Sequence, residues 1–316
     1  MVSVPYRARV PIQTRSFAAE DVDAVAALAA DSYLHARAAE PLLGGRLGDP
    51  GQLRARIAGL TGTVAVREGE LAAAWLAAPS GGAQAAPAWG VVGELDAIRA
   101  AYAVQAAGWV PAGARTHTAM VNVADVALHD ALVDLGFGHE QAYAVRTLED
   151  PTPAPDGVDV RPGTPADLDA VLSLAPVIGR HQVQSPVFAR VGPSFFGQLE
   201  ESHREELANP EAHYLLASVD GEVLGAAIWY LGEEDWLVPP QSSELAWAVV
   251  AESARGRGVG LALTAAAMAA ATDAGATSMV TDWRTTNLLS SRFWPGRGFR
   301  PIAHRMARTI DPEPAD

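Results

Sequence analysis

A short glycine-rich segment carries the clearest chemistry in this sequence. Residues 255–260 read Arg-Gly-Arg-Gly-Val-Gly; they follow a strand-like stretch, 243–250, and precede an alanine-rich stretch, 261–274, that predicts a helix ended by Gly275. Glycines let the backbone approach phosphates closely, and free N–H groups at a helix N-terminus point at an anion. The order strand, glycine loop, helix therefore predicts a pyrophosphate site, to which the two arginines add positive charge.

Two other nucleotide-binding loops do not fit this segment. All 23 basic residues are arginine, so the chain contains no Gly-Lys-Ser/Thr of a P-loop. The glycines are spaced GxGxG, whereas the Rossmann fingerprint reads GxGxxG. Taken alone, the segment fits a plain turn as well as a phosphate loop, so residues elsewhere in the chain must decide.

The elements that would position this loop occur twice along the chain. Residues 158–171 match residues 12–25 at a constant offset of 146, and each copy reads as a short strand leading into an Asp-capped helix. Residues 69–75 and 221–229 then read as the turn and second strand of a hairpin. This order predicts a duplication of one α/β fold, with a period too long for a solenoid.

The boundary between the copies is marked by prolines. Residues 151–157 hold three prolines and a glycine, which favour a linker. Before it, Gly136-Phe137 closes a helix ahead of a last strand, and Gly298-Phe299 does the same in the second copy. The predicted domains are therefore 1–150 and 151–316.

Composition excludes several classes of protein. The net charge of −14, from 37 acidic and 23 basic residues, disfavours nucleic-acid partners. No apolar run reaches about 18 residues and the N-terminus lacks a secretory h-region, so we expect no membrane partner and a cytoplasmic location. The absence of cysteine excludes thiolate nucleophiles and disulfides. No metal site is expected, since no ligand set surrounds His117 or His129 in the sequence, and both are interpreted as structural.

A second motif decides between a turn and a phosphate site. Arg255, Gly258 and Gly260 fill the pattern Gln/Arg-x-x-Gly-x-Gly/Ala, and a second set follows at fixed offsets: Asn287, Ser290, Trp294, Gly298 and Phe299. Together the two motifs resemble those of the GNAT superfamily of acyl-CoA-dependent N-acyltransferases. The resemblance covers most of residues 158–310.

The resemblance implies an α/β fold of the α+β kind, a mixed, strongly twisted sheet with helices on both faces. Its fourth and fifth strands, here 244–250 and 278–283, would splay apart to admit the pantetheine arm of acetyl-CoA, which is the implied co-substrate. The residues that the resemblance assigns to acetyl-CoA are Val249, Val250, Ala251, Arg255, Gly256, Arg257, Gly258, Val259, Gly260, Asn287, Ser290 and Trp294.

Glu244 is the leading candidate for a catalytic base. Several family members place a glutamate on the fourth strand, and Glu244 lies eleven residues before Arg255. Strand alternation puts Glu244 on one face with Ala246 and Ala248, which would leave room for a substrate. Partial burial would raise the pKa of its carboxyl. A surface glutamate at a strand end is the alternative.

The remaining catalytic candidates are weaker. Trp294 stands where much of the family has a tyrosine that protonates the leaving thiolate; an indole N–H is no usable acid, so packing on pantetheine is the favoured role. Asp282, at the end of the fifth strand, could hold an ammonium or cap a loop. Tyr230, Arg284 and His304 are candidates of the same second rank as Asp282. Residues 180–182, Arg-His-Gln, lie where the family places its acceptor-binding segment.

The first half lacks this machinery. No Arg-x-x-Gly-x-Gly precedes Gly136; Asp125 stands where the second copy has Asn287, and Leu132 where it has Trp294. Residues 1–150 are therefore interpreted as a degenerate copy that either completes the acceptor pocket or covers a sheet edge.

These observations favour an acetyl-CoA-dependent N-acetyltransferase that acts on a small-molecule amine by direct attack. A catalytically inactive acyl-CoA-binding sensor or scaffold is the alternative from another class. A mycothiol-synthase-like acetyltransferase is a narrower alternative, which tandem-domain length favours and the missing tyrosine disfavours. The sequence does not decide between a monomer and a homodimer.

Overall fold

The computed structural model describes residues 11–80, 83–149 and 153–311, which form two compact units. The first unit comprises Met1–Glu140 with Ala303–Asp316, and the second comprises Gln141–Ile302. These bounds differ from the predicted boundary at residue 150 because each half of the sequence gives its last strand to the other unit. The sequence repeat therefore holds, but the folded units exchange one strand.

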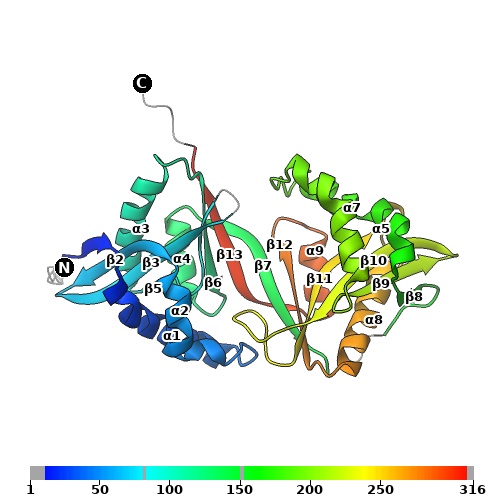
Figure 1. Ribbon diagram of the computed structural model, residues 1–316, viewed down its shortest axis with the longest axis horizontal. Helices are drawn as coiled ribbons and strands as arrows, with labels where there is room; N and C mark the ends of the chain where they lie inside the picture. The colour runs from blue at the N-terminus through cyan, green and yellow to red at the C-terminus, as the bar shows by residue number, and fades with distance from the viewer. Residues whose placement is uncertain (1–10, 81–82, 150–152, 312–316) are drawn as a thin grey trace, which may run out of the picture. The chain divides into compact units, whose positions relative to one another are not determined.

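The first unit is a mixed sheet in the order β1-β2-β3-β4-β6-β13, with β5 paired to β3. All pairs are antiparallel except β4 with β6. The exchanged strand β13, red in Figure 1, pairs with β6 over Ala303–Thr309. Its strands are β1 (Gln13–Ser16), β2 (Thr61–Arg67), β3 (Glu70–Ser80), β4 (Ala83–Ala86), β5 (Val91–Gly93), β6 (Thr116–Asn122) and β13 (Arg300–Thr309).

Four α-helices belong to this unit, among the residues described. Alanine-rich stretches with apolar residues at helical spacing form α1 and α3, which bury one side each against the sheet. The core contains Trp75, whose ring lies 4.5 Å from that of Tyr102. The helices are α1 (Val22–Ala39), α2 (Pro50–Ala58), α3 (Leu95–Trp109) and α4 (Val126–Asp134), with 3-10 turns η1 (Ala19–Asp21) and η2 (Arg46–Gly48).

The second unit repeats this plan in the order β7-β12-β11-β10-β9-β8. Only β11 and β12 are parallel, and the exchanged strand β7 pairs with β12. Figure 1 shows β7 in green beside β12 in orange. The strands are β7 (Gly138–Thr147), β8 (Asp159–Pro162), β9 (His213–Val219), β10 (Glu222–Leu231), β11 (Ser242–Val250) and β12 (Ser278–Arg284).

Helices cover both faces of this second sheet. On one face α8 packs on a core that includes Trp229, Leu245 and Met279. On the other, α5 and α7 pack on a core that includes Ile228 and Val249. The helical elements are η3 (Pro165–Asp167), α5 (Leu168–Leu174), α6 (Pro176–Gln182), α7 (Pro193–Ala208), η4 (Glu252–Ala254), α8 (Val259–Asp273), α9 (Ser290–Phe293) and η5 (Pro295–Arg297).

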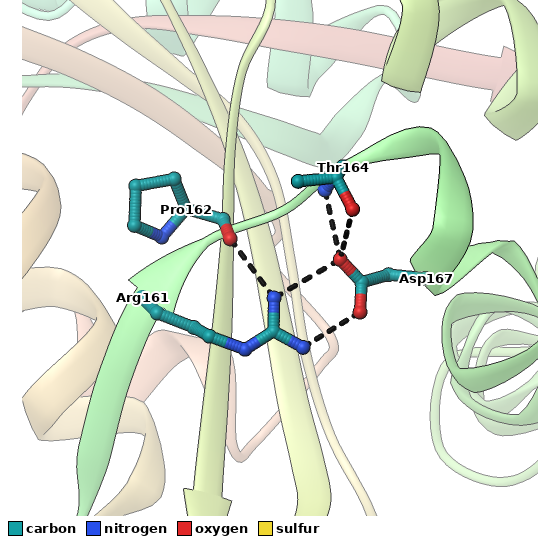
Figure 2. Close-up of polar contacts among 4 residues, drawn as sticks. All are labelled: Arg161, Pro162, Thr164 and Asp167. Atoms are coloured by element: carbon teal, nitrogen blue, oxygen red, sulfur yellow. Dashed lines mark hydrogen bonds and ion pairs between the residues drawn. The ribbon is translucent and has the colours of Figure 1, made fainter.

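Both halves begin with the same ion pair, as the repeat predicts. In Figure 2 the guanidinium of Arg161 donates to both carboxylate oxygens of Asp167, at 2.6 and 3.0 Å, and the Thr164 amide donates to the same carboxylate at 2.8 Å. Arg15 and Asp21 form the equivalent pair in the first half, with both bonds at 2.6 Å. In each case the arginine lowers the pKa of the aspartate. The predicted helix starts are therefore confirmed.

The predicted hairpins are confirmed by their turns. Asp220-Gly221 joins β9 to β10 with φ values of 53° and 82°, and Glu68-Gly69 joins β2 to β3 with 54° and 87°. Positive φ at both central residues is the type I′ geometry that matches strand twist. Within the described residues, no helix has both the length and the apolar character needed to cross a bilayer.

Candidate active site

The glycine loop lies between β11 and α8, as predicted. Gly256 and Gly258 adopt φ values of 80° and 86°, a region that side chains with a Cβ disfavour. A Cβ at Gly258 would also lie 3.0 Å from Cγ of Pro155. At the other end of α8, Gly275 has a φ of 90° and ends the helix. Glycines thus fix both ends of this helix.

Backbone amides at this turn are available to a ligand. The amides of Arg255 and Arg257 donate to carbonyls within the turn, at 3.3 and 3.2 Å. In the described part of the chain, the amides at positions 256 and 258–261 have no backbone acceptor. The first N–H groups of a helix lack intrahelical partners and carry its positive dipole end. Such a turn can donate hydrogen bonds to an anion.

A cavity of about 430 Å³ opens at this turn. Its walls come from α6, β11, the glycine loop, α8 and the α9 segment. Two predicted cofactor residues, Ala251 and Arg257, are not in its lining, and the Ala251 amide donates to the Leu224 carbonyl of β10 at 2.8 Å. The predicted residues that line it are Val249, Val250, Arg255, Gly256, Gly258, Val259, Gly260, Asn287, Ser290 and Trp294.

Strands β11 and β12 part beside this cavity. Their parallel pairing covers three residue pairs and ends at Glu244 and Val280, while β11 continues to Val250. The Thr281 hydroxyl donates to the Leu245 carbonyl at 2.9 Å, just past the last pair. Beyond that, the edge of β11 toward β12 has no partner strand among the described residues. The splayed strands implied by the resemblance are confirmed.

A β-bulge corrects the predicted face of Glu244. Tyr230 pairs with Glu244, Trp229 with Leu245 and Ile228 with Trp247, so Ala246 is the extra residue. Glu244 therefore shares its face with Trp247 and Val249, and the prediction that placed it on one face with Ala248 is wrong. The alternation of side chains reverses at a bulge, which periodicity alone does not reveal.

Glu244 lies among other carboxylates at the point where the strands part. We call Glu206, Glu244 and Asp282 the carboxylate cluster. Burial, and secondarily the charge of Asp282, raises the pKa of Glu244. The Tyr230 hydroxyl donates to Glu206 Oε2 at 2.6 Å, and burial and these glutamates raise the pKa of Tyr230. Neither Glu244 nor Asp282 is in the lining of the 430 Å³ cavity.

The exchanged strand β7 also reaches this cluster. The side-chain amide of Gln141 donates to Asp282 Oδ2, and Tyr143 stands opposite Asp282 in the ladder. The first half of the sequence thus supplies a group that holds Asp282. No sequence motif marks Gln141, Tyr143 or Glu206, because only the strand exchange and the packing of α7 bring them here.

Trp294 and Asn287 have defined packing roles. Trp294 is buried between the rings of Phe293 and Phe299, with centroids at 4.9 and 5.4 Å, and also lines the cavity. Oδ1 of Asn287 accepts from the amides of Leu289 and Ser290, at 3.1 and 3.3 Å. It also lies 3.1 Å from Nε2 of His181, another lining residue.

A family model matches part of the second half of the chain. Residues 185–299 match the model of the family described as Acetyltransferase (GNAT) family. A search of curated proteins finds no match.

Solved structures match nearly the whole chain. A GCN5-related N-acetyltransferase from Sphaerobacter thermophilus is 16% identical, with a TM-score of 0.60 over 96% of this chain and 98% of that one. A tandem GNAT protein from the clavulanic acid biosynthesis pathway is 18% identical, with a TM-score of 0.53 over 97% and 100%. A GNAT-family acetyltransferase from Colwellia psychrerythraea is 12% identical, with a TM-score of 0.51 over 95% and 100%.

These findings agree on the fold. Residues 185–299 match the GNAT acetyltransferase family model, and the chain as a whole has the fold of tandem GNAT proteins. The resemblance inferred from the two sequence motifs is confirmed.

Proposed function

We propose that the second unit is an acetyl-CoA-dependent N-acetyltransferase whose acceptor is a small-molecule amine. The observation that supports it most is the set of unpaired amides at positions 256 and 258–261, which line a 430 Å³ cavity beside two parted strands. A diphosphate is the anion that such a glycine turn fits. The guanidinium of Arg255, also in the lining, adds positive charge.

The pantetheine arm fits the free edge of β11. From Ala246 to Val250 this edge offers backbone donors and acceptors without a partner strand, and an amide-containing arm can pair with it as a strand would. The arm would then run from the glycine turn toward the fork, the point at Glu244 where β11 and β12 separate. Trp294 and Phe293 would pack on its apolar parts.

The carboxylate cluster would bind the amine acceptor and remove its proton. Three acidic groups at the fork attract an alkylammonium, and Glu244, with its raised pKa, takes the ammonium proton. The neutral amine nitrogen then attacks the thioester carbonyl carbon, forming the C–N bond as the C–S bond breaks, and the extra proton on the nitrogen passes to solvent or to the departed thiolate, which gives the amide and the free thiol. The thiolate leaves without protonation by Trp294, since the indole N–H is no acid at neutral pH.

Steady-state assays with acetyl-CoA and a panel of small amines test this proposal. We expect release of one free thiol per acetylated amine with wild type, and a large loss of kcat in Glu244→Gln with unchanged acetyl-CoA affinity. Absence of turnover across the panel, together with tight acetyl-CoA binding, would favour the second candidate, an acyl-CoA-binding sensor. Trp294 in place of the family tyrosine, and the position of Glu244 outside the cavity lining, are the observations on that side.

A further inference from the structure

Three histidines meet in the first unit, away from the glycine turn. His129 lies on α4, His139 on β7 and His304 on the exchanged strand β13. One ring nitrogen from each lies within 4.8 Å of the other two. His139 Nε2 and His129 Nδ1 are 3.3 Å apart, which is close to the separation of two ligands on a tetrahedral zinc ion with bonds of about 2.0–2.1 Å.

The rings approach from different directions. The ring of His129 is nearly perpendicular to those of His139 and His304, at 78° and 84°, while His139 stacks on His304 at 4.1 Å and 21°. Stacked rings cannot both aim a lone pair at one ion. His139 is exposed, so a turn about its Cβ–Cγ bond can bring its nitrogen into line.

One ring nitrogen of this cluster is buried without a hydrogen-bond partner in the described structure. It is Nδ1 of His304. A buried polar atom without a partner is costly, and a bound ion is one way to satisfy it.

We propose that His129, His139 and His304 form a binding site for a divalent transition metal of the zinc type. Imidazole is a preferred ligand of zinc, copper and nickel, and three imidazole nitrogens leave the fourth tetrahedral position to solvent on the exposed side of His139. The ion would join α4, β7 and β13. The sequence shows no sign of a metal site here, because His304 comes from the other half of the chain.

Metal titration of the full chain without an affinity tag tests the proposal. Protein stripped with a chelator is titrated with Zn²⁺ against a chromogenic chelator, and with Co²⁺, whose visible absorption reports tetrahedral nitrogen coordination. The variants are His139→Ala and His304→Gln. His35→Ala is the matched control, since His35 is an exposed histidine of the same unit, with 79% of its side chain accessible.

We expect one equivalent of Zn²⁺ for wild type and His35→Ala, and an affinity at least about 10-fold lower for His139→Ala and His304→Gln, since loss of even an outer partner of a metal ligand costs 10–100-fold. The melting temperature should rise with Zn²⁺ only where binding persists. Failure of wild type to take up Zn²⁺ or Co²⁺, or unchanged affinity in His139→Ala, would overturn the site. If His304→Gln does not fold, the exposed position 139 still decides.

Discussion

The corresponding helices α3 and α8 begin with opposite chemistry. In the second unit α8 starts at Gly258, with no acidic residue in its first turn and free amides facing a cavity. In the first unit α3 starts at Glu94 and has Asp96 in its first turn. Arg67 pairs with both carboxylates, at 2.5 and 2.8 Å. The first unit thus places two carboxylates, paired with Arg67, at its helix start, whereas the start of α8 carries no acidic side chain.

The strands beside these helices differ in the same way. Register places Ala85 of β4 as the third pair of its parallel ladder, where β11 has Glu244. On the neighbouring antiparallel strand of the first unit, β3, Ala78 pairs with Ala85. In the second unit, Tyr230 of β10 pairs with Glu244 at the matching position. The first unit retains the backbone plan and has methyl groups in place of the titratable ones, which supports its interpretation as a degenerate copy.

The largest effect on kcat is expected when Glu244 is replaced by a residue that cannot titrate, as Ala85 cannot at the matching position of the first unit. Glu244→Gln should lower kcat by about 10²–10⁴-fold, the usual contribution of a general base, without changing acetyl-CoA affinity. Glu222→Gln, at an exposed position of β10, is the control and should retain full activity. Equal kcat in both variants would remove Glu244 from the reaction.

An aspartate introduced in the first turn of α8 should give this helix start the negative charge that α3 has. Gly260 occupies the position in α8 that Asp96 occupies in α3. Gly260→Asp should weaken acetyl-CoA binding by about 100-fold or more relative to Gly260→Asn, because like charges about 4 Å apart repel by about 4 kcal/mol at an effective dielectric constant of 20. The Asn variant has the same shape without the charge. Similar affinities in calorimetry would show that no phosphate lies there.

The pH profile tests the coupling within the carboxylate cluster. Burial and the charge of Asp282 raise the pKa of Glu244, so the acidic limb of kcat/KM should lie above the ordinary glutamate value of 4.5. Asp282→Asn removes the like charge and should move that limb to lower pH. An unmoved limb in this variant would separate Asp282 from the base.

The repeated Arg–Asp cap predicts similar stability losses in both halves. Asp21→Asn and Asp167→Asn should each cost about 1 kcal/mol of unfolding free energy at neutral pH, measured by denaturant titration. The arginines lower both pKa values, so the stabilisation is complete above the ordinary carboxyl pKa and is lost on acidification. Asp23→Asn, which breaks an exposed pair with Arg54, is the control and should cost less.

The smallest effect is expected at Trp294, whose counterpart in the first half is Leu132. Because the ring packs between Phe293 and Phe299, Trp294→Phe should keep kcat within about threefold. A large fall in kcat at unchanged acetyl-CoA affinity would instead assign the indole N–H a part in the reaction.

Local sequence patterns predicted much of this architecture. The Asp caps, the I′ hairpins and the turn at Gly258 each depend on residues adjacent in the chain, so motif and periodicity were enough. The bulge at Ala246 was not predictable, because alternation in β11 reads the same with or without an extra residue. The strand exchange was also missed, since β7 and β13 have the same pattern whichever sheet they join.

Non-local contacts account for the missed residues of the site. Gln141 reaches Asp282 only because β7 joins the second sheet, and Glu206 meets Tyr230 only through the packing of α7. The histidine cluster requires β13 beside α4. Each of these depends on the pairing of segments far apart in sequence.

Calorimetric titration of the full chain with acetyl-CoA tests the central claim most directly. Since one unit offers free amides at its helix start and the other holds its own carboxylates there, we predict one equivalent bound per chain in wild type, and binding weaker by about 100-fold or more in Gly260→Asp. Two equivalents, or no binding to wild type, would contradict this account.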